Sequence, residues 1–204
     1  MNIVGPVGTK ELYDFAAEYY KEDLAYRALR VGREFKEDIA MNVQELTGGA
    51  SLELNGISVR TTEVVHTIIT LAYRFDVEGK AIVISGDTAY SENLVELAKG
   101  ADILVMDSGA LIMKENPQSN QAGPPSSRRP AQVNGKSSTR AHATLQEIAT
   151  MAQKAGVKCL VLTHFSRGEV DMEASTTATE AIYDGTIIYS EDLMEITCPQ
   201  EATD

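Results

Sequence analysis

The sequence predicts an α/β fold, and two patterns along its 204 residues carry this prediction. Between residues 35 and 85, short apolar segments separated by turn signals are typical of strands in one sheet. After residue 86, helical and strand-like segments alternate, as they do in α/β layers. With 43% apolar residues, the chain can bury the core of one domain, so we expect a single domain over residues 1–204.

The first 32 residues predict a short strand, a turn and one long helix. Gly5-Pro6 and Gly8 indicate the turn, and Thr9 stands where a helix cap is expected. Gly32 suits the left-handed residue that ends many helices. Apolar residues at helical spacing predict a face that packs into the core. They are Leu12, Phe15, Ala16, Tyr19, Leu24, Ala28 and Val31.

Two hairpins connect the strands predicted in the first half of the chain. Asn55-Gly56 is a strong signal for a type I′ turn, because both central residues of that turn need a positive φ. Glu78-Gly79 is a weaker signal of the same kind. The predicted strands cover residues 39–46, 51–54, 57–65, 68–75 and 81–85.

The second half predicts two helix–strand units separated by a long loop. Residues 114–140 are rich in Pro, Gly, Ser, Asn and Gln, which predicts a flexible loop or lid. Arg128-Arg129 and Lys136 in this loop could attract an anionic substrate or could simply be solvated. The helices are predicted at 91–98 and 144–155, and the strands at 103–106, 158–163, 186–189 and 193–197.

Composition restricts the partners and the compartment. A formal charge of −12 would repel a phosphate backbone, so nucleic acid is a disfavoured partner. Two cysteines, Cys159 and Cys198, are too few for a disulfide framework, which suits a reducing cytoplasm. Neither a signal peptide nor a membrane span is evident, so we expect no membrane partner. Export remains an alternative, because a segment upstream of Met1 could carry a signal.

Three polar residues follow apolar strand segments and are candidates for a shared metal site. His66, Asp87 and His164 each stand just beyond a predicted strand, where side chains project from the sheet edge. Imidazole and carboxylate together suit Zn, Mn or Fe(II). The alternative is that each is a structural or surface histidine, or an aspartate that forms a turn.

His142 lies after the long loop and just before a predicted helix. The helix dipole there disfavours a protonated imidazole, so a neutral ring could exchange protons during catalysis. A loop histidine without a chemical role is the alternative.

Five short motifs occur in a fixed order, and together they resemble the metallo-β-lactamase superfamily, especially its ribonuclease Z and arylsulfatase-like branch. The resemblance implies an αββα sandwich flanked by helices, with sites for two zinc ions. It also implies a metal-dependent hydrolase that uses a metal-bound hydroxide to attack phosphodiester, sulfate or carboxylic ester bonds. The motifs are VGPVGT at 4–9, VVH at 64–66 with AYRF at 72–75, SGDT at 85–88, AHAT at 141–144 and LTHFS at 162–166.

The same resemblance implies a role for each candidate residue. His66 corresponds to a ligand of the first metal, Asp87 to the carboxylate that bridges both metals, and His164 to a ligand of the second. His142 corresponds to the histidine that assists the reaction by stabilising or protonating the leaving group. The implied catalytic residues are therefore His142 and Asp87, and zinc is the implied metal, with Mn or Fe as alternatives.

The sequence departs from the family pattern in three places. The ligand cluster His-x-His-x-Asp-His normally precedes the Gly-Pro-x-Gly turn, and this chain begins at that turn, so we expect an N-terminally incomplete fold. Met106-Asp107-Ser108 stands where relatives often carry His-Glu-Ala, and the shorter aspartate is expected to weaken the support of His142. Only residues 76–80 occupy the place of the long tRNA-binding arm, which favours a small anionic or ester substrate.

Three alternatives to an active hydrolase remain open. The chain could be a truncated, non-catalytic remnant that acts as a binding or interaction module. It could also form a homodimer, or associate with a partner that supplies the missing N-terminal half, because an uncovered sandwich face exposes apolar area. A doubly wound nucleotide-binding domain is disfavoured, since no glycine-rich phosphate loop joins a strand to a helix.

Overall fold

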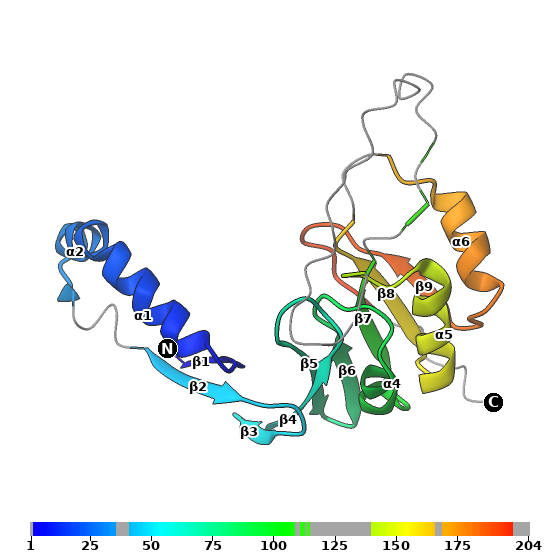
Figure 1. Cartoon of the computed structure of the whole chain (residues 1–204), viewed down its shortest axis with the longest axis horizontal. Helices are drawn as coiled ribbons and strands as arrows, with labels where there is room; N and C mark the ends of the chain where they lie inside the picture. The colour runs from blue at the N-terminus through cyan, green and yellow to red at the C-terminus, as the bar shows by residue number, and fades with distance from the viewer. Residues whose placement is uncertain are drawn as a thin grey trace.

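A seven-stranded mixed sheet forms the centre of the computed structural model, which describes residues 2–35, 41–108, 111–112, 114, 140–165 and 169–197. Its spatial order follows the chain order from β3 to β9 (Figure 1). The strands are β3 (Ser51–Leu54), β4 (Ile57–Val64), β5 (Thr70–Val77), β6 (Lys80–Ile84), β7 (Ile103–Asp107), β8 (Cys159–Thr163) and β9 (Thr186–Tyr189). This mixed architecture confirms the α/β class.

The strand directions bring several carboxyl ends to one edge. Strands β3 to β6 pair antiparallel, and β6 to β9 pair parallel. Strands β4, β6, β7, β8 and β9 therefore run in the same direction. Both predicted hairpin turns are confirmed, with φ of 52° and 84° at Asn55-Gly56 and of 49° and 73° at Glu78-Gly79.

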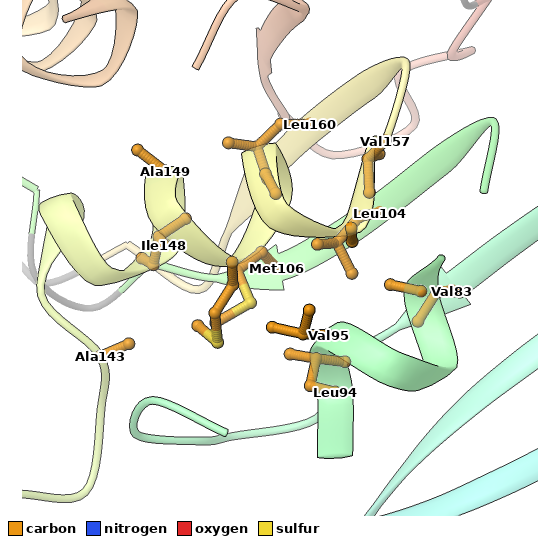
Figure 2. Close-up of a cluster of buried hydrophobic side chains, with 14 of the residues drawn as sticks. Val83, Leu94, Val95, Leu104, Met106, Ala143, Ile148, Ala149, Val157 and Leu160 are labelled. Atoms are coloured by element: carbon orange, nitrogen blue, oxygen red, sulfur yellow. The ribbon is translucent and has the colours of Figure 1, made fainter. Parts of the chain in front are cut away.

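Helices α4 (Glu92–Ala98), α5 (Leu145–Ala155) and α6 (Met172–Glu180) pack on one side of this sheet (Figure 1). Leu94 and Ile148 from the helices meet Val83, Leu104 and Leu160 from the strands in the core (Figure 2). All five side chains are fully buried. Burial of apolar area of this kind is the main stabilising contribution to such a layer.

The ends of these helices follow the local sequence. Ser91 caps α4, and Thr144 forms a capping box with Glu147 at the start of α5, as expected where the two helices were predicted. Helix α6 was not predicted, because its sequence MEASTTATE lacks an apolar stripe. Asp171 caps α6 by accepting a hydrogen bond from the Ala174 N–H.

The N-terminal region differs most from its prediction. The single long helix is instead two, α1 (Thr9–Tyr19) and α2 (Lys21–Arg30), which meet at Tyr20. Thr9 is the first helical residue and donates to the Pro6 carbonyl, while Glu45 Oε1 accepts from the N–H groups of Gly8 and Lys10.

The prediction that the apolar stripe of these helices packs into the core is also wrong. Leu12, Phe15 and Tyr19 are 69%, 67% and 71% exposed, and Ala28 alone among the stripe residues is buried. The physical reason is that helical periodicity shows which residues share a face, but burial requires a surface to cover that face. Figure 1 shows α1 and α2 extending away from the large sheet.

The prediction of one sheet is wrong for the first strands. Strand β1 (Asn2–Pro6) pairs in parallel with β2 (Asn42–Leu46) in a separate two-stranded sheet. Residues 193–197 lie outside the strands, contrary to prediction. The predicted loop or lid at 114–140, with Arg128-Arg129 and Lys136, falls outside the described residues except at its two ends. Within the described ranges, none of the helices combines the length and apolar content needed to cross a membrane.

Candidate metal centre

The carboxyl edge of the large sheet collects the chemically active side chains. His66 follows β4, Asp87 follows β6, and His164 follows β8 directly. His142 reaches the same edge on the segment that leads into α5. The parallel direction of these strands explains why residues up to about one hundred positions apart in sequence meet here.

Backbone hydrogen bonds tie the loops of this edge together. The Ala89 N–H donates to the Val65 carbonyl at 2.8 Å, which joins the Asp87 loop to the His66 loop. The Ala143 N–H donates to the Thr88 carbonyl at 2.8 Å, which joins the His142 segment to the Asp87 loop. Such links limit the freedom of the site side chains before any ligand binds.

Asp87, His142 and His164 have side-chain nitrogen or oxygen atoms that all lie within 4.8 Å of one another. His66 lies beside this group, and its ring centre is 5.7 Å from that of His142. The rings of His142 and His164 are 5.4 Å apart. The structure therefore brings all four predicted residues to one place, with His142 between His66 and His164.

All three histidines turn Nδ1 toward an oxygen. His66 Nδ1 lies 2.9 Å from the Ala141 carbonyl, and His142 Nδ1 lies 2.5 Å from Asp107 Oδ2. His164 Nδ1 lies 3.2 Å from both Asp87 Oδ1 and Asp107 Oδ1. Carbonyl and carboxylate oxygens only accept, so the bonded Nδ1 atoms of His66 and His142 donate, which leaves Nε2 with a lone pair in the neutral ring. Metal-binding histidines are held in this way in many proteins.

Asp107 was not among the predicted site residues, although the resemblance had already placed it near His142. It ends β7, between the strands that lead to Asp87 and His164, and its side chain is 2% exposed. Besides His142, its carboxylate accepts a hydrogen bond from the Thr88 N–H at 3.2 Å. The shorter reach of an aspartate had put the support of His142 in doubt, but the backbone of β7 brings Asp107 Oδ2 within 2.5 Å of His142 Nδ1. Its position directly after an apolar strand was the available signal.

Two backbone conformations at this edge are unusual. Gly86 has φ of 63°, and a Cβ there would lie 2.9 Å from Thr70 Cγ2 and 3.2 Å from the Leu71 carbonyl oxygen. Glycine is thus required for the turn that aims Asp87. His164 has φ of 59°, which costs about 1 kcal/mol or more for a residue with a Cβ. The surrounding contacts hold His164 in this strained conformation.

The fold and this cluster define a class of protein, the metallo-β-lactamase superfamily. The family model described as "Beta-lactamase superfamily domain" matches residues 9–165, and the chain belongs to that family. This confirms the family predicted from the five motifs. The family is one of hydrolases whose fold implies a divalent metal.

The similar sequences are named ribonuclease Z. The protein from Mycobacterium tuberculosis (strain H37Rv) is 28% identical over 201 residues, which are 95% of this chain and 67% of that protein. The protein from Mycobacterium avium (strain 104) is 30% identical over 80% of this chain and 54% of its own length. The chain thus spans between about half and two thirds of these two relatives.

Solved structures show the same fold. Human tRNase Z, short form, is 22% identical with a TM-score of 0.57, over 98% of this chain and 67% of that one. Zinc-bound PqqB from Methylobacterium extorquens is 14% identical with a TM-score of 0.58, over 94% of this chain and 60% of that one.

Proposed function

We propose that this chain carries the metal-binding edge of a zinc-dependent hydrolase that cleaves phosphodiester bonds. The observation that carries the proposal is that Asp87 and His164 converge at the carboxyl edge of the sheet, within 4.8 Å of each other and of His142, with the His66 ring 5.7 Å from that of His142. One carboxylate and several imidazoles are donors that zinc accepts readily, and Mn or Fe(II) are alternatives. A divalent cation bound here would lower the pKa of bound water and offset negative charge on the substrate.

The proposed division of labour follows the contacts of each residue. His66, Asp87 and His164 would hold metal, and the two oxygens of Asp87 would allow it to serve two ions in the complete site. His142 would handle the proton of the leaving group, because Asp107 holds its Nδ1 and leaves the Nε2 lone pair of the neutral ring available for proton transfer. Metal content distinguishes this role of His142 from that of a ligand, since a residue that only transfers a proton is dispensable for metal binding.

The substrate class rests on three observations. Phosphodiesters are favoured over sulfate and carboxylic esters because the similar sequences are named ribonuclease Z. A small anionic substrate is favoured over RNA because the chain carries a charge of −12. The two-residue turn Glu78-Gly79 between β5 and β6 also leaves no room there for an inserted arm.

A non-catalytic binding module is the second candidate function. The observation that favours it is the exposed apolar surface of α1 and α2, which would suit an interaction role. A module of this kind would bind no transition metal. Metal content therefore separates the two candidates.

The test combines metal content with hydrolysis of bis(4-nitrophenyl) phosphate. We expect zinc in the purified wild-type chain, loss of both zinc and hydrolysis in His164→Ala, and retained zinc with reduced hydrolysis in His142→Ala. Lys99→Ala is a matched control, because Lys99 pairs with Glu96 at the surface. Unchanged metal and hydrolysis in His164→Ala would refute its assignment, and loss of zinc in His142→Ala would make His142 a ligand.

A further inference from the structure

Residues 140–144 link two loops of the metal centre through their backbone. The Ala141 carbonyl lies 2.9 Å from His66 Nδ1 and accepts its hydrogen bond. Two residues later, the Ala143 N–H donates to the Thr88 carbonyl at 2.8 Å, in the loop that follows β6. Ala143 itself is fully buried in the core (Figure 2). The position of this segment therefore affects the surroundings of two proposed metal ligands.

A single carboxylate, that of Glu147 in the first turn of α5, holds both ends of this segment. Its Oε1 accepts from Arg140 Nη2 at 2.6 Å, and its Oε2 accepts from the Thr144 N–H at 2.8 Å. Arg140 and Thr144 are the first and last residues of the segment. Glu147 thus closes residues 140–144 into a short loop, and a closed loop has fewer conformations available to it. The Ala141 carbonyl is held in place as a result.

The charge of Glu147 suits this role. Its side chain is 28% exposed, against 51% for that of Arg140. Burial raises the pKa of Glu147, but hydrogen bonds from the Thr144 N–H and from Arg140 outweigh burial and leave the pKa below its ordinary value. The carboxylate is therefore charged at neutral pH, and hydrogen bonds to a charged acceptor are stronger than those between neutral groups.

The capping box of α5 gives Glu147 an ordinary structural role as well, because its N–H and side chain pair with Thr144. Two contacts go beyond that role. The bond from Arg140 reaches Glu147 across seven residues and is no part of the capping box. The bond from His66 to Ala141 joins residues 75 positions apart, so the segment that Glu147 closes also serves a histidine of the metal centre.

We propose that Glu147 is a positioning residue for His66, and that it acts through residues 140–144 and the Ala141 carbonyl. A carbonyl only accepts, so it keeps the ring hydrogen of neutral His66 on Nδ1 and leaves the lone pair of Nε2 available for a metal. Once the segment is released, the hydrogen can move to Nε2 and occupy that lone pair. The importance for metal binding rests on the proposed function, whereas the position of the hydrogen can be measured in the metal-free chain.

The first measurement is the tautomer of His66 in the metal-free chain, from NMR correlations of the ring nitrogens at alkaline pH. The chain has three histidines, and His66→Gln assigns the signals of His66. The second measurement is the Kd for zinc, by competition with a chromogenic chelator. Glu147→Ala removes both side-chain acceptors. Glu147→Gln keeps the capping box, in which glutamine also serves, but its single oxygen cannot accept from both Thr144 and Arg140.

Asp171→Ala is the matched control, because Asp171 caps α6 in the way that Thr144 caps α5. Its carboxylate accepts from the Ala174 N–H at 3.0 Å, and within the described residues it bonds to none of the site histidines. Urea unfolding measures the stability that each variant loses. A general loss of stability is thereby separated from an effect on His66.

We expect the fraction of His66 with hydrogen on Nδ1 to fall by about half or more in Glu147→Ala, by less in Glu147→Gln, and not at all in Asp171→Ala. The zinc Kd should rise roughly tenfold in Glu147→Ala and stay unchanged in Asp171→Ala. An unchanged His66 tautomer in Glu147→Ala, or an equal change in Asp171→Ala, would overturn the proposal.

Two further outcomes are decisive. If Glu147→Ala does not fold, Glu147→Gln decides in its place, and an unchanged tautomer there overturns the proposal. The expected tautomer change in a chain that binds no zinc would support the positioning of His66 and contradict the proposed function. The two proposals can therefore fail separately.

Discussion

Replacing Asp107 by Asn tests whether one buried carboxylate positions two histidines. Its oxygens lie 2.5 Å from His142 Nδ1, 3.2 Å from His164 Nδ1 and 3.2 Å from the Thr88 nitrogen. An amide offers one acceptor oxygen instead of two, and its NH₂ group would face ring or backbone N–H groups. At least one of these contacts is therefore lost, and the orientation of the rings is lost with it.

The size of the effect follows from the role of such supporting groups. Loss of a residue that orients metal ligands weakens metal binding about 10- to 100-fold, or about 1.4 to 2.8 kcal/mol. We expect the Kd for zinc, measured by competition with a chromogenic chelator, to rise by this factor in Asp107→Asn. The free energy of unfolding in urea without zinc should fall by about 1 to 3 kcal/mol, because buried N–H groups lose an acceptor.

Asp102→Asn is the control for a merely structural effect. Asp102 accepts from the Ala81 N–H at 2.8 Å and pairs with Lys158, and it contacts none of the site histidines in the described structure. This variant should lose stability and keep its zinc affinity. A zinc Kd within twofold of wild type in Asp107→Asn, or an equal rise in both variants, would refute the positioning role.

Two further predictions concern stability. Gly86→Ala should lower the free energy of unfolding by more than the roughly 1 to 2 kcal/mol expected for a positive φ alone, because the new methyl group meets the neighbouring strand. Gly100→Ala is the control: it has φ of 62° and no atom within 4 Å of the new Cβ, so it should show the cost of the positive φ alone. Equal losses in the two variants, measured by urea unfolding, would contradict this prediction. Burial raises the pKa of Asp102, but hydrogen bonds from the Ala81 N–H and Lys158 outweigh burial and leave the pKa below its ordinary value. The difference in free energy of unfolding between the wild type and Asp102→Asn should therefore be full at pH 7 and should shrink as the pH falls below about 4. Urea unfolding at both pH values measures this difference, and a difference that does not change with pH would contradict the prediction.

The sequence predicted the second half of the fold well, because local signals and tertiary packing agree there. Ser91 and Thr144 cap the starts of α4 and α5. Asn55-Gly56 forms a turn that its own positive φ preference determines, independently of tertiary contacts. Helix α6 shows the opposite case. Its serines and threonines give no apolar period, and Asp171 and packing against α5 define it instead.

Long-range association explains the errors at the N-terminus. The stripe containing Leu12 and Phe15 has helical spacing, but spacing does not reveal whether another surface covers it. The pairing of β1 with β2 could likewise not be predicted, since the residue pattern of a strand does not show which strand it pairs with. Tyr20, where the helix breaks, carries no helix-stopping signal of the glycine or proline kind.

The residues of the candidate site could be predicted better than the contacts between them. Placement after strands made His66, Asp87 and His164 candidates, because strand ends share an edge, and the resemblance to the family supplied the roles proposed for them. The resemblance placed Asp107 beside His142 but left its support in doubt, because whether the contact forms depends on how far β7 extends. The assigned metal roles and the cytoplasmic location stay predictions.

X-ray absorption at the zinc edge, on the purified chain loaded with one equivalent of zinc, tests the central claim most directly. We expect zinc to be coordinated by imidazole nitrogens and carboxylate oxygens at about 2.0 to 2.2 Å. His164→Ala should lose part of the imidazole scattering. Zinc that is surrounded by water or sulfur alone, or a spectrum unchanged by His164→Ala, would contradict a metal centre at this sheet edge.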